Sequence, residues 1–114
     1  MQPDSELARL ADLLDAAAAE RKTLLYIDAA ERLELPGPRR IQRLARLLEA
    51  LTEADFAAGR PVRAALVVSK ARPGLPAPGF FDCAARLGLF RPGESPQRLH
   101  ERLLQEVFGN SDRG

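Results

Sequence analysis

A cluster of arginines has the most suggestive spacing in this chain. The positions of three of them, Arg39, Arg43 and Arg46, differ by four and then three residues, so the three share one face of a helix. The polar residues on or beside this face are Arg39, Arg40, Gln42, Arg43 and Arg46. No acidic residue lies between Glu34 and Glu49, so the cluster has no partner within its own helix. Guanidinium groups suit phosphate oxygens and the edge of guanine, and the cluster therefore predicts contact with DNA.

The composition leaves an alternative open. Arginine outnumbers lysine 15 to 2, which is typical of a GC-rich coding bias that raises arginine everywhere. The net charge is +1, whereas stand-alone DNA-binding proteins usually carry a clear basic excess. The same face would then be a solvated surface or the contact surface for a protein partner, because one fold can serve both functions.

Residues that could support catalysis do not form a recognisable group. The chain has one histidine, His100, in a predicted helix, and one cysteine, Cys83, among apolar residues typical of a core. Glu53 and Asp55 have no histidine or glycine-rich loop near them in sequence. Zinc sites need several cysteines or histidines, and there is no GxxxxGK[ST] or GxGxxG motif. We expect no enzyme activity, no cofactor and no metal.

The elements that would position the arginines follow from hydrophobic periodicity and from proline and glycine. Helices are predicted at residues 5–20, 28–35, 38–57 and 96–108, with a further short helix ending at Leu87. Asp28 and Glu31 have the spacing of a capping box. Pro36–Pro38 predicts a tight turn before the long helix, in which Ile41, Leu44 and Leu48 should face the core.

Strand signals surround the long helix. Residues 23–27 and 62–69 are rich in β-branched and aromatic residues, and residues 71–79 contain three prolines. We therefore expect a mainly α fold with a small β-hairpin (α+β), a winged helix-turn-helix-like single domain. Its recognition helix would be 38–48 and its wing 68–80, with Lys70 and Arg72 at the turn of the wing.

Length and hydropathy complete the expected organisation. The 114 residues suit one domain, predicted over 1–110, with a disordered tail at 111–114. The sequence contains no long apolar run that could span a membrane and does not begin like a secretory signal. We expect a cytoplasmic protein that does not contact membranes.

Residues 23–43 resemble the winged-helix DNA-binding domain of the O6-alkylguanine-DNA alkyltransferases and their alkyltransferase-like relatives. The matching positions are Tyr26, Ala30, Pro36 and Arg40, and Leu66–Val68 and Gly79–Phe80 are similar to later parts of the motif. The resemblance implies that Tyr26 helps to rotate a nucleotide and that Arg40 fills the space it leaves. The family's Pro-Cys-His-Arg box is replaced by residues 63–66, Arg-Ala-Ala-Leu, so alkyl transfer to a cysteine is excluded at that place.

These observations favour a non-catalytic module that binds double-stranded DNA. The residues predicted to touch DNA are Tyr26, Arg39, Arg40, Gln42, Arg43, Arg46, Lys70 and Arg72. The alternative is a protein–protein interaction module on the same winged-helix scaffold, within a bacterial or phage complex. Sequence reasoning leaves both functions open.

Overall fold

The computed structural model describes the backbone of residues 3–113 and the side chains of residues 6–109. This part of the chain is mainly helical. In chain order its elements are α1 (Pro3–Ala19), β1 (Leu24–Leu25), α2 (Tyr26–Arg32), α3 (Arg40–Ala57), the 3-10 helix η1 (Arg63–Leu66), β2 (Val67–Val68), α4 (Pro78–Arg86) and α5 (Pro96–Arg113). The predicted predominance of helix and the small amount of β structure are confirmed.

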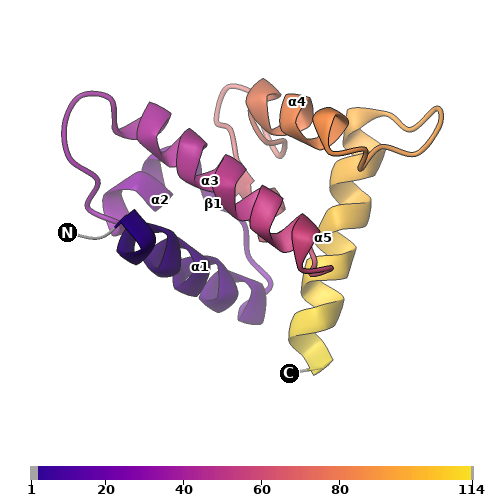
Figure 1. Ribbon diagram of the computed structural model, residues 1–114, viewed down its shortest axis with the longest axis horizontal. Helices are drawn as coiled ribbons and strands as arrows, with labels where there is room; N and C mark the ends of the chain where they lie inside the picture. Colours follow the sequence, from indigo (N-terminus) through magenta and orange to yellow (C-terminus); the bar gives the residue numbers. More distant parts are fainter. Residues whose placement is uncertain (1–2, 114) are drawn as a thin grey trace.

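Helices α1 and α3 lie side by side, α4 lies along the other side of α3, and α5 covers one end of the molecule (Figure 1). The short helix η1 packs against α1, α3 and α5. Ala64 and Ala65 of η1 are buried, and their small side chains allow the three helices to approach this segment closely. Residues far apart in the sequence are thereby joined around one core.

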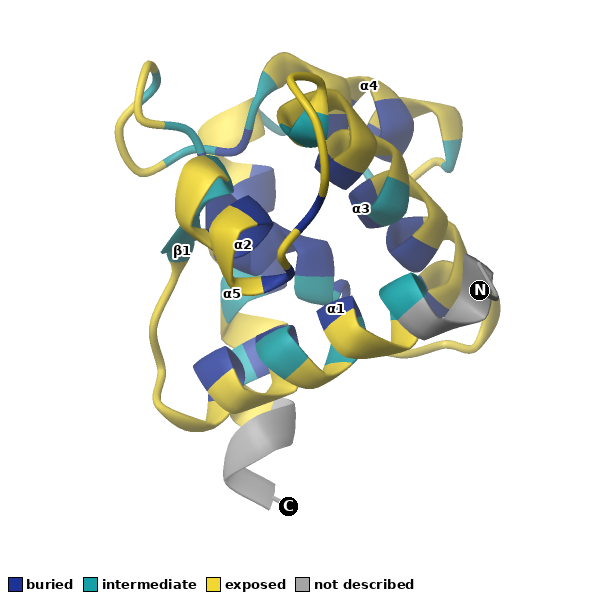
Figure 2. Cartoon of the chain, turned by 90° about the vertical axis from the view of Figure 1, so that its left-hand side faces the viewer, coloured by how far each residue is buried: buried dark blue, intermediate teal, exposed yellow. Residues whose placement is uncertain are grey.

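The core consists of the apolar stripes of the helices, which appear as the dark blue inner faces in Figure 2. The buried apolar residues of α1, α3 and α5 are Leu10, Leu14, Ala17 and Ala18; Leu44, Leu48 and Leu51; and Leu99, Leu103 and Val107. Burial of one leucine side chain contributes about 1.5–3 kcal/mol to folding, so these stripes supply much of the stabilisation.

The predicted β-hairpin is wrong. The sheet that the structure describes has two strands, β1 and β2, and they pair in parallel with Leu24 opposite Val67. Half of the expected strand at 62–69 is the 3-10 helix η1, and the end of the expected wing at 68–80 belongs to helix α4, which begins at Pro78 and confirms the short helix predicted to end at Leu87. Prolines at 73, 76 and 78 cannot donate backbone hydrogen bonds, which disfavours a strand ladder here.

Residues 69–77 form a loop that closes on itself where the wing was expected. The Ser69 N–H donates to the Leu75 carbonyl at 2.7 Å, and the Leu75 N–H donates to the Arg72 carbonyl at 2.9 Å. The Ser69 hydroxyl accepts from the Ala71 N–H at 3.2 Å. These bonds give the loop a defined shape without a partner strand.

The connection between α2 and α3 is longer than the predicted three-residue turn and runs from Leu33 to Arg39. Glu34 adopts a φ of 55° and Gly37 a φ of 82°, so the chain reverses through two left-handed residues. Leu33 and Leu35 are buried and anchor the connection, and the Arg9 guanidinium donates to the Leu33 carbonyl.

Two predicted details of the helices differ from the structure. Helix α2 begins at Tyr26, so Asp28 lies in its first turn and does not cap it. Ile41 was expected in the core but is 39% exposed, because α3 turns Leu44 inward. Helix α3 does end as predicted, with Gly59 left-handed and the Arg60 N–H bonded to the Asp55 carbonyl.

At the other end of the chain, α5 continues to Arg113, through most of the predicted tail at 111–114. Gly109 weakens a helix but keeps its N–H, so the hydrogen-bond ladder can continue. Gly114 lies outside the described residues. None of the helices in the described part is both long and apolar enough to cross a membrane.

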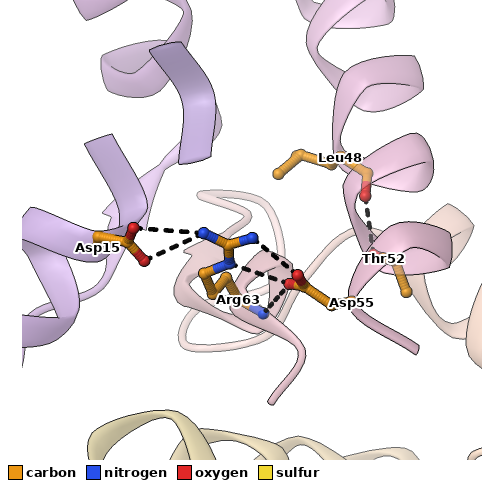
Figure 3. A network of polar contacts seen from close by, with 5 residues as sticks. All are labelled: Asp15, Leu48, Thr52, Asp55 and Arg63. Carbon is orange, nitrogen blue, oxygen red and sulfur yellow. Dashed lines mark hydrogen bonds and ion pairs between the residues drawn. The ribbon is translucent and has the colours of Figure 1, made fainter. Parts of the chain in front are cut away.

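A buried ion pair holds η1 in place (Figure 3). Asp55 of α3 is 1% exposed and accepts bonds from the Arg63 backbone N–H, Nε and Nη2 at 3.1, 3.1 and 2.8 Å. Arg63 also contacts the exposed carboxylate of Asp15 in α1 at 3.2 Å. These hydrogen bonds, above all those that Arg63 donates to Asp55, raise the pKa of Arg63. One guanidinium thus joins α1, η1 and α3.

His100 of α5 also contacts η1. Its Nε2 lies 2.8 Å from the Ala65 carbonyl oxygen, so the neutral ring donates this bond as the Nε2–H tautomer. Burial lowers the pKa of His100 below its usual 6.5, partly offset by the bond to Ala65 and by Glu101. The buried histidine is therefore a structural contact between α5 and η1.

Replacing Asp55 with asparagine should lower the free energy of unfolding by about 3 kcal/mol, because the half-buried Arg63 loses its charged partner. Urea denaturation measures this. The matched control is Asp15→Asn, which removes an exposed carboxylate from the same guanidinium and should cost less than about 1 kcal/mol. Equal losses for the two variants would contradict the central role given to Asp55.

Stability should depend on pH through His100. Because its pKa is lower in the folded chain, the unfolded chain takes up this proton first as the pH falls. The contribution is complete above the unfolded value of about 6.5 and is lost as the pH falls through the folded pKa. Thermal unfolding followed between pH 8 and pH 5 should show this loss in the native chain and not in His100→Gln. An unchanged profile in the variant would exclude His100 as its source.

Candidate nucleic-acid interface

The first half of α3 carries a polar recess on its outer face. The recess has a volume of about 220 Å³ and is lined by Pro36, Arg39, Gln42, Arg43 and Arg46. Arg39 is the N-cap residue of α3, no side chain caps the helix, and its first turn holds no acid. The positive end of the helix dipole and three guanidinium groups therefore meet at this place, which we call the arginine recess.

The arginines differ in how far they are already paired. Arg43 forms a two-pronged ion pair with Glu6 of α1, at 2.8 and 3.1 Å, and the Glu6 hydrogen bond raises the pKa of Arg43. Arg40 lies to the side of the recess, 3.8 Å from Glu31 of α2. Within the described residues, Arg39 and Arg46 are exposed and form no ion pair.

The charge on the outer face of α3 changes in the second half of the helix. Glu49 and Glu53 follow the arginines, and both accept hydrogen bonds from Arg86 of α4, at 3.3 and 2.9 Å. The basic surface therefore ends near Arg46, and the two acids beyond it share one cation from another helix.

The structure does not bring Lys70 and Arg72 into the arginine recess. Both lie on the self-closing loop 69–77, where Lys70 is exposed. The Arg72 guanidinium lies 5.6 Å from the centre of the Phe81 ring, a cation–π contact that fixes its direction.

Tyr26 has a structural contact as well as a place in the predicted site. Its hydroxyl accepts a hydrogen bond from the Ala77 N–H at 3.2 Å, which ties the end of the loop to the first turn of α2. Burial raises the pKa of Tyr26, partly offset by this bond. The side chain lies outside the arginine recess.

Tyr26 instead lines a second hollow, which we call the tyrosine pocket and which sequence reasoning did not find. It has a volume of about 200 Å³ and is lined by Tyr26, Ala45, Arg46, Leu48, Glu49, Thr52, Ala77, Gly79, Phe80 and Cys83. Arg46 lines both hollows. The resemblance gave the available signal, because it grouped Tyr26 with the Gly79–Phe80 pair.

The remaining candidates for chemistry have ordinary surroundings. Cys83 is buried in the wall of the tyrosine pocket, and burial raises the pKa of its thiol, so the reactive thiolate is disfavoured. Within the part of the chain that the structure describes, no group of three histidine, cysteine, aspartate or glutamate residues could hold a metal ion.

Comparison with known proteins identifies no relative of this chain. No protein-family model, no curated protein and no solved structure matches the chain. The resemblance to the alkyltransferases stays a prediction. Its positions have clear places in the structure: Ala30 is buried, Pro36 lines the arginine recess and Arg40 lies beside that recess.

Replacing Tyr26 with phenylalanine should destabilise the chain by about 1 kcal/mol, because the Ala77 N–H loses its acceptor. Urea denaturation gives the free energy, and amide exchange at Ala77 should become faster. Unchanged stability together with unchanged exchange at Ala77 would show that the hydroxyl contributes nothing to the fold.

Proposed function

We propose that the chain is a non-catalytic DNA-binding module whose α3 lies against the duplex with its first half. The observation that carries this proposal is the arginine recess, where the exposed guanidinium groups of Arg39 and Arg46, which have no ion pair among the described residues, meet Gln42 and Arg43. In this proposal α2 and α3 act as a helix-turn-helix, and α3 is the recognition helix.

The chemistry of the recess suits a phosphate of the DNA backbone. Arginine donates two parallel hydrogen bonds to phosphate oxygens, and several guanidinium groups around one recess can share the negative charge. Such contacts position a protein on DNA without reading the sequence. Gln42 at the centre of the face adds a side chain that can donate to and accept from a base edge.

The ion pair between Glu6 and Arg43 is compatible with this role. Glu6 holds the Arg43 guanidinium at the border of the recess, so less rotamer entropy is lost when a phosphate binds. The carboxylate also competes with that phosphate for the same donor. Glu6 therefore both orients Arg43 and weakens its contribution.

The other predicted contacts fit a supporting role. Lys70 and Arg72 lie on loop 69–77, which takes the place of a wing and would supply further phosphate contacts. Arg40 stands beside the recess, next to α2. Tyr26 would contact a nucleotide only at the tyrosine pocket, which adjoins the recess at Arg46.

A protein partner is the second candidate function. The observation that favours it is the change of charge along α3, where Glu49 and Glu53 continue the face that begins with the arginines. DNA would meet these acids beyond Arg46, whereas a protein surface with both signs of charge would complement them.

Arg46→Gln and Arg39→Gln should each weaken binding to duplex DNA by about tenfold, since hydrogen bonds to charged groups contribute about 1.5–3 kcal/mol. Each should also reduce the slope of log affinity against log salt by about 1. Fluorescence anisotropy with a labelled duplex of mixed sequence measures both quantities.

The matched control is Arg98→Gln, which makes the same charge change on the exposed face of α5. It should leave the affinity within about twofold, because α5 lies away from the first half of α3 (Figure 1) and salt screens exposed charges beyond about 10 Å. If wild-type affinity shows no steep loss with salt, or if the three variants lose affinity equally, the DNA-binding proposal fails and the protein partner becomes the favoured function.

Glu6→Gln should strengthen DNA binding, because the competing charge is removed and Arg43 is released towards the recess. The same titration, with Glu101→Gln on exposed α5 as control, isolates the local effect from the change in net charge. Equal gains for the two variants would show that only net charge matters.

A further inference from the structure

The tyrosine pocket has the size and lining of a site for a small ring. Its walls come from the first residue of α2, one side of α3, and the start of α4 with the residue before it. Leu48, Phe80 and Ala45 give it a largely apolar surface. An engineered cavity of about 150 Å³ holds benzene, so a pocket of about 200 Å³ has room for one ring with a short substituent.

Most polar groups of the pocket are already engaged. The Thr52 hydroxyl donates to the Leu48 carbonyl at 2.8 Å, and the Glu49 carboxylate accepts from Arg86 at 3.3 Å. The Tyr26 hydroxyl accepts from the Ala77 N–H, and among the described residues no acceptor takes its own proton. Among the lining side chains, the Tyr26 hydroxyl and the Arg46 guanidinium are the O–H and N–H donors that can still bind a ligand.

The charge of Arg46 favours an anionic ligand over a cationic one. Arg46 is the lining cation and has no ion pair within the described chain, while the Glu49 carboxylate is paired with Arg86, which it shares with Glu53. An anionic substituent would gain a charge-assisted bond at the border of a low-dielectric pocket, and a cationic one would meet Arg46.

We propose that the tyrosine pocket binds a small aromatic carboxylate. The ring packs between Phe80, Leu48 and Ala45, and the carboxylate accepts hydrogen bonds from Arg46 and the Tyr26 hydroxyl. No bond is made or broken, and the ligand acts by occupancy.

Binding in this pocket has a consequence for the arginine recess, because Arg46 lines both hollows. A guanidinium that holds the ligand's carboxylate is less available to a DNA phosphate. The ligand therefore opposes DNA binding; this second step rests on the proposed function, whereas occupancy of the pocket does not.

The test is a titration of the ¹⁵N-labelled full chain, followed by NMR. The three probes share a 4-methylphenyl ring and differ in charge: 4-methylbenzoate, 4-methylbenzyl alcohol and 4-methylbenzylammonium. We expect 4-methylbenzoate to bind at least about fivefold more tightly than the other two, with shifts at Arg46, Ala77 and Gly79. Arg46→Gln should bring the three affinities together. An anion that binds no better than the cation, or shifts elsewhere only, would overturn the proposal.

Two alanines of α3 provide a matched pair of variants. Ala45 is exposed and lines the pocket, so Ala45→Leu fills it without disturbing the core, and 4-methylbenzoate binding should be lost. Ala54 is exposed on the same helix and lines neither hollow, so Ala54→Leu should bind normally. Retained binding in a folded Ala45→Leu would overturn the site.

A separate arm adds 4-methylbenzoate to the complex with labelled duplex. Release of DNA from the wild type but not from Ala45→Leu is the expected result. A chain that binds the carboxylate but never DNA would refute the proposed function and leave the pocket standing. A chain that binds DNA but not the carboxylate would refute the pocket alone.

Discussion

The buried contact between Arg63 and Asp55 determines where the chain crosses the middle of the molecule. It fixes η1 against α3, and Asp15 extends the same guanidinium contact to α1. The residues that follow η1 form β2 and pair with β1, which ends where α2 begins. The ion pair therefore ties η1 to α3 and α1, and the strand pair that follows joins this segment to the start of α2.

The helices could be predicted from the sequence because their signals are local. The leucine spacing of α3 and the arginines on its outer face could be predicted from the helical period alone. The parallel pairing of β1 with β2 could not be predicted, because strands of two residues carry little pattern and their partners lie far apart in sequence. The strand propensity of residues 62–69 gave a wrong prediction for residues 63–66, because the packing of Ala64 and Ala65 among three helices outweighed it.

The candidate site could be predicted in part, because the spacing of residues along one helix is a local signal. Spacing placed Arg39, Arg43 and Arg46 together, and the structure gathers these three around the recess. Spacing could not show that Glu6, thirty-seven residues before Arg43, pairs with it, or that Arg86 pairs with both Glu49 and Glu53. Tertiary contacts thus decide which cations remain available. Arg46 stands out, because it is unpaired among the described residues and borders both hollows.

The most direct test of the account is an NMR titration of the ¹⁵N-labelled chain with duplex DNA at low and at high salt. If the first half of α3 binds DNA, the amide shifts concentrate on residues 36–46, with smaller changes on loop 69–77, and they fade together as salt rises. Shifts that centre on α1 or α5, or that persist unchanged at high salt, would contradict the claim that the first half of α3 is the surface that meets DNA.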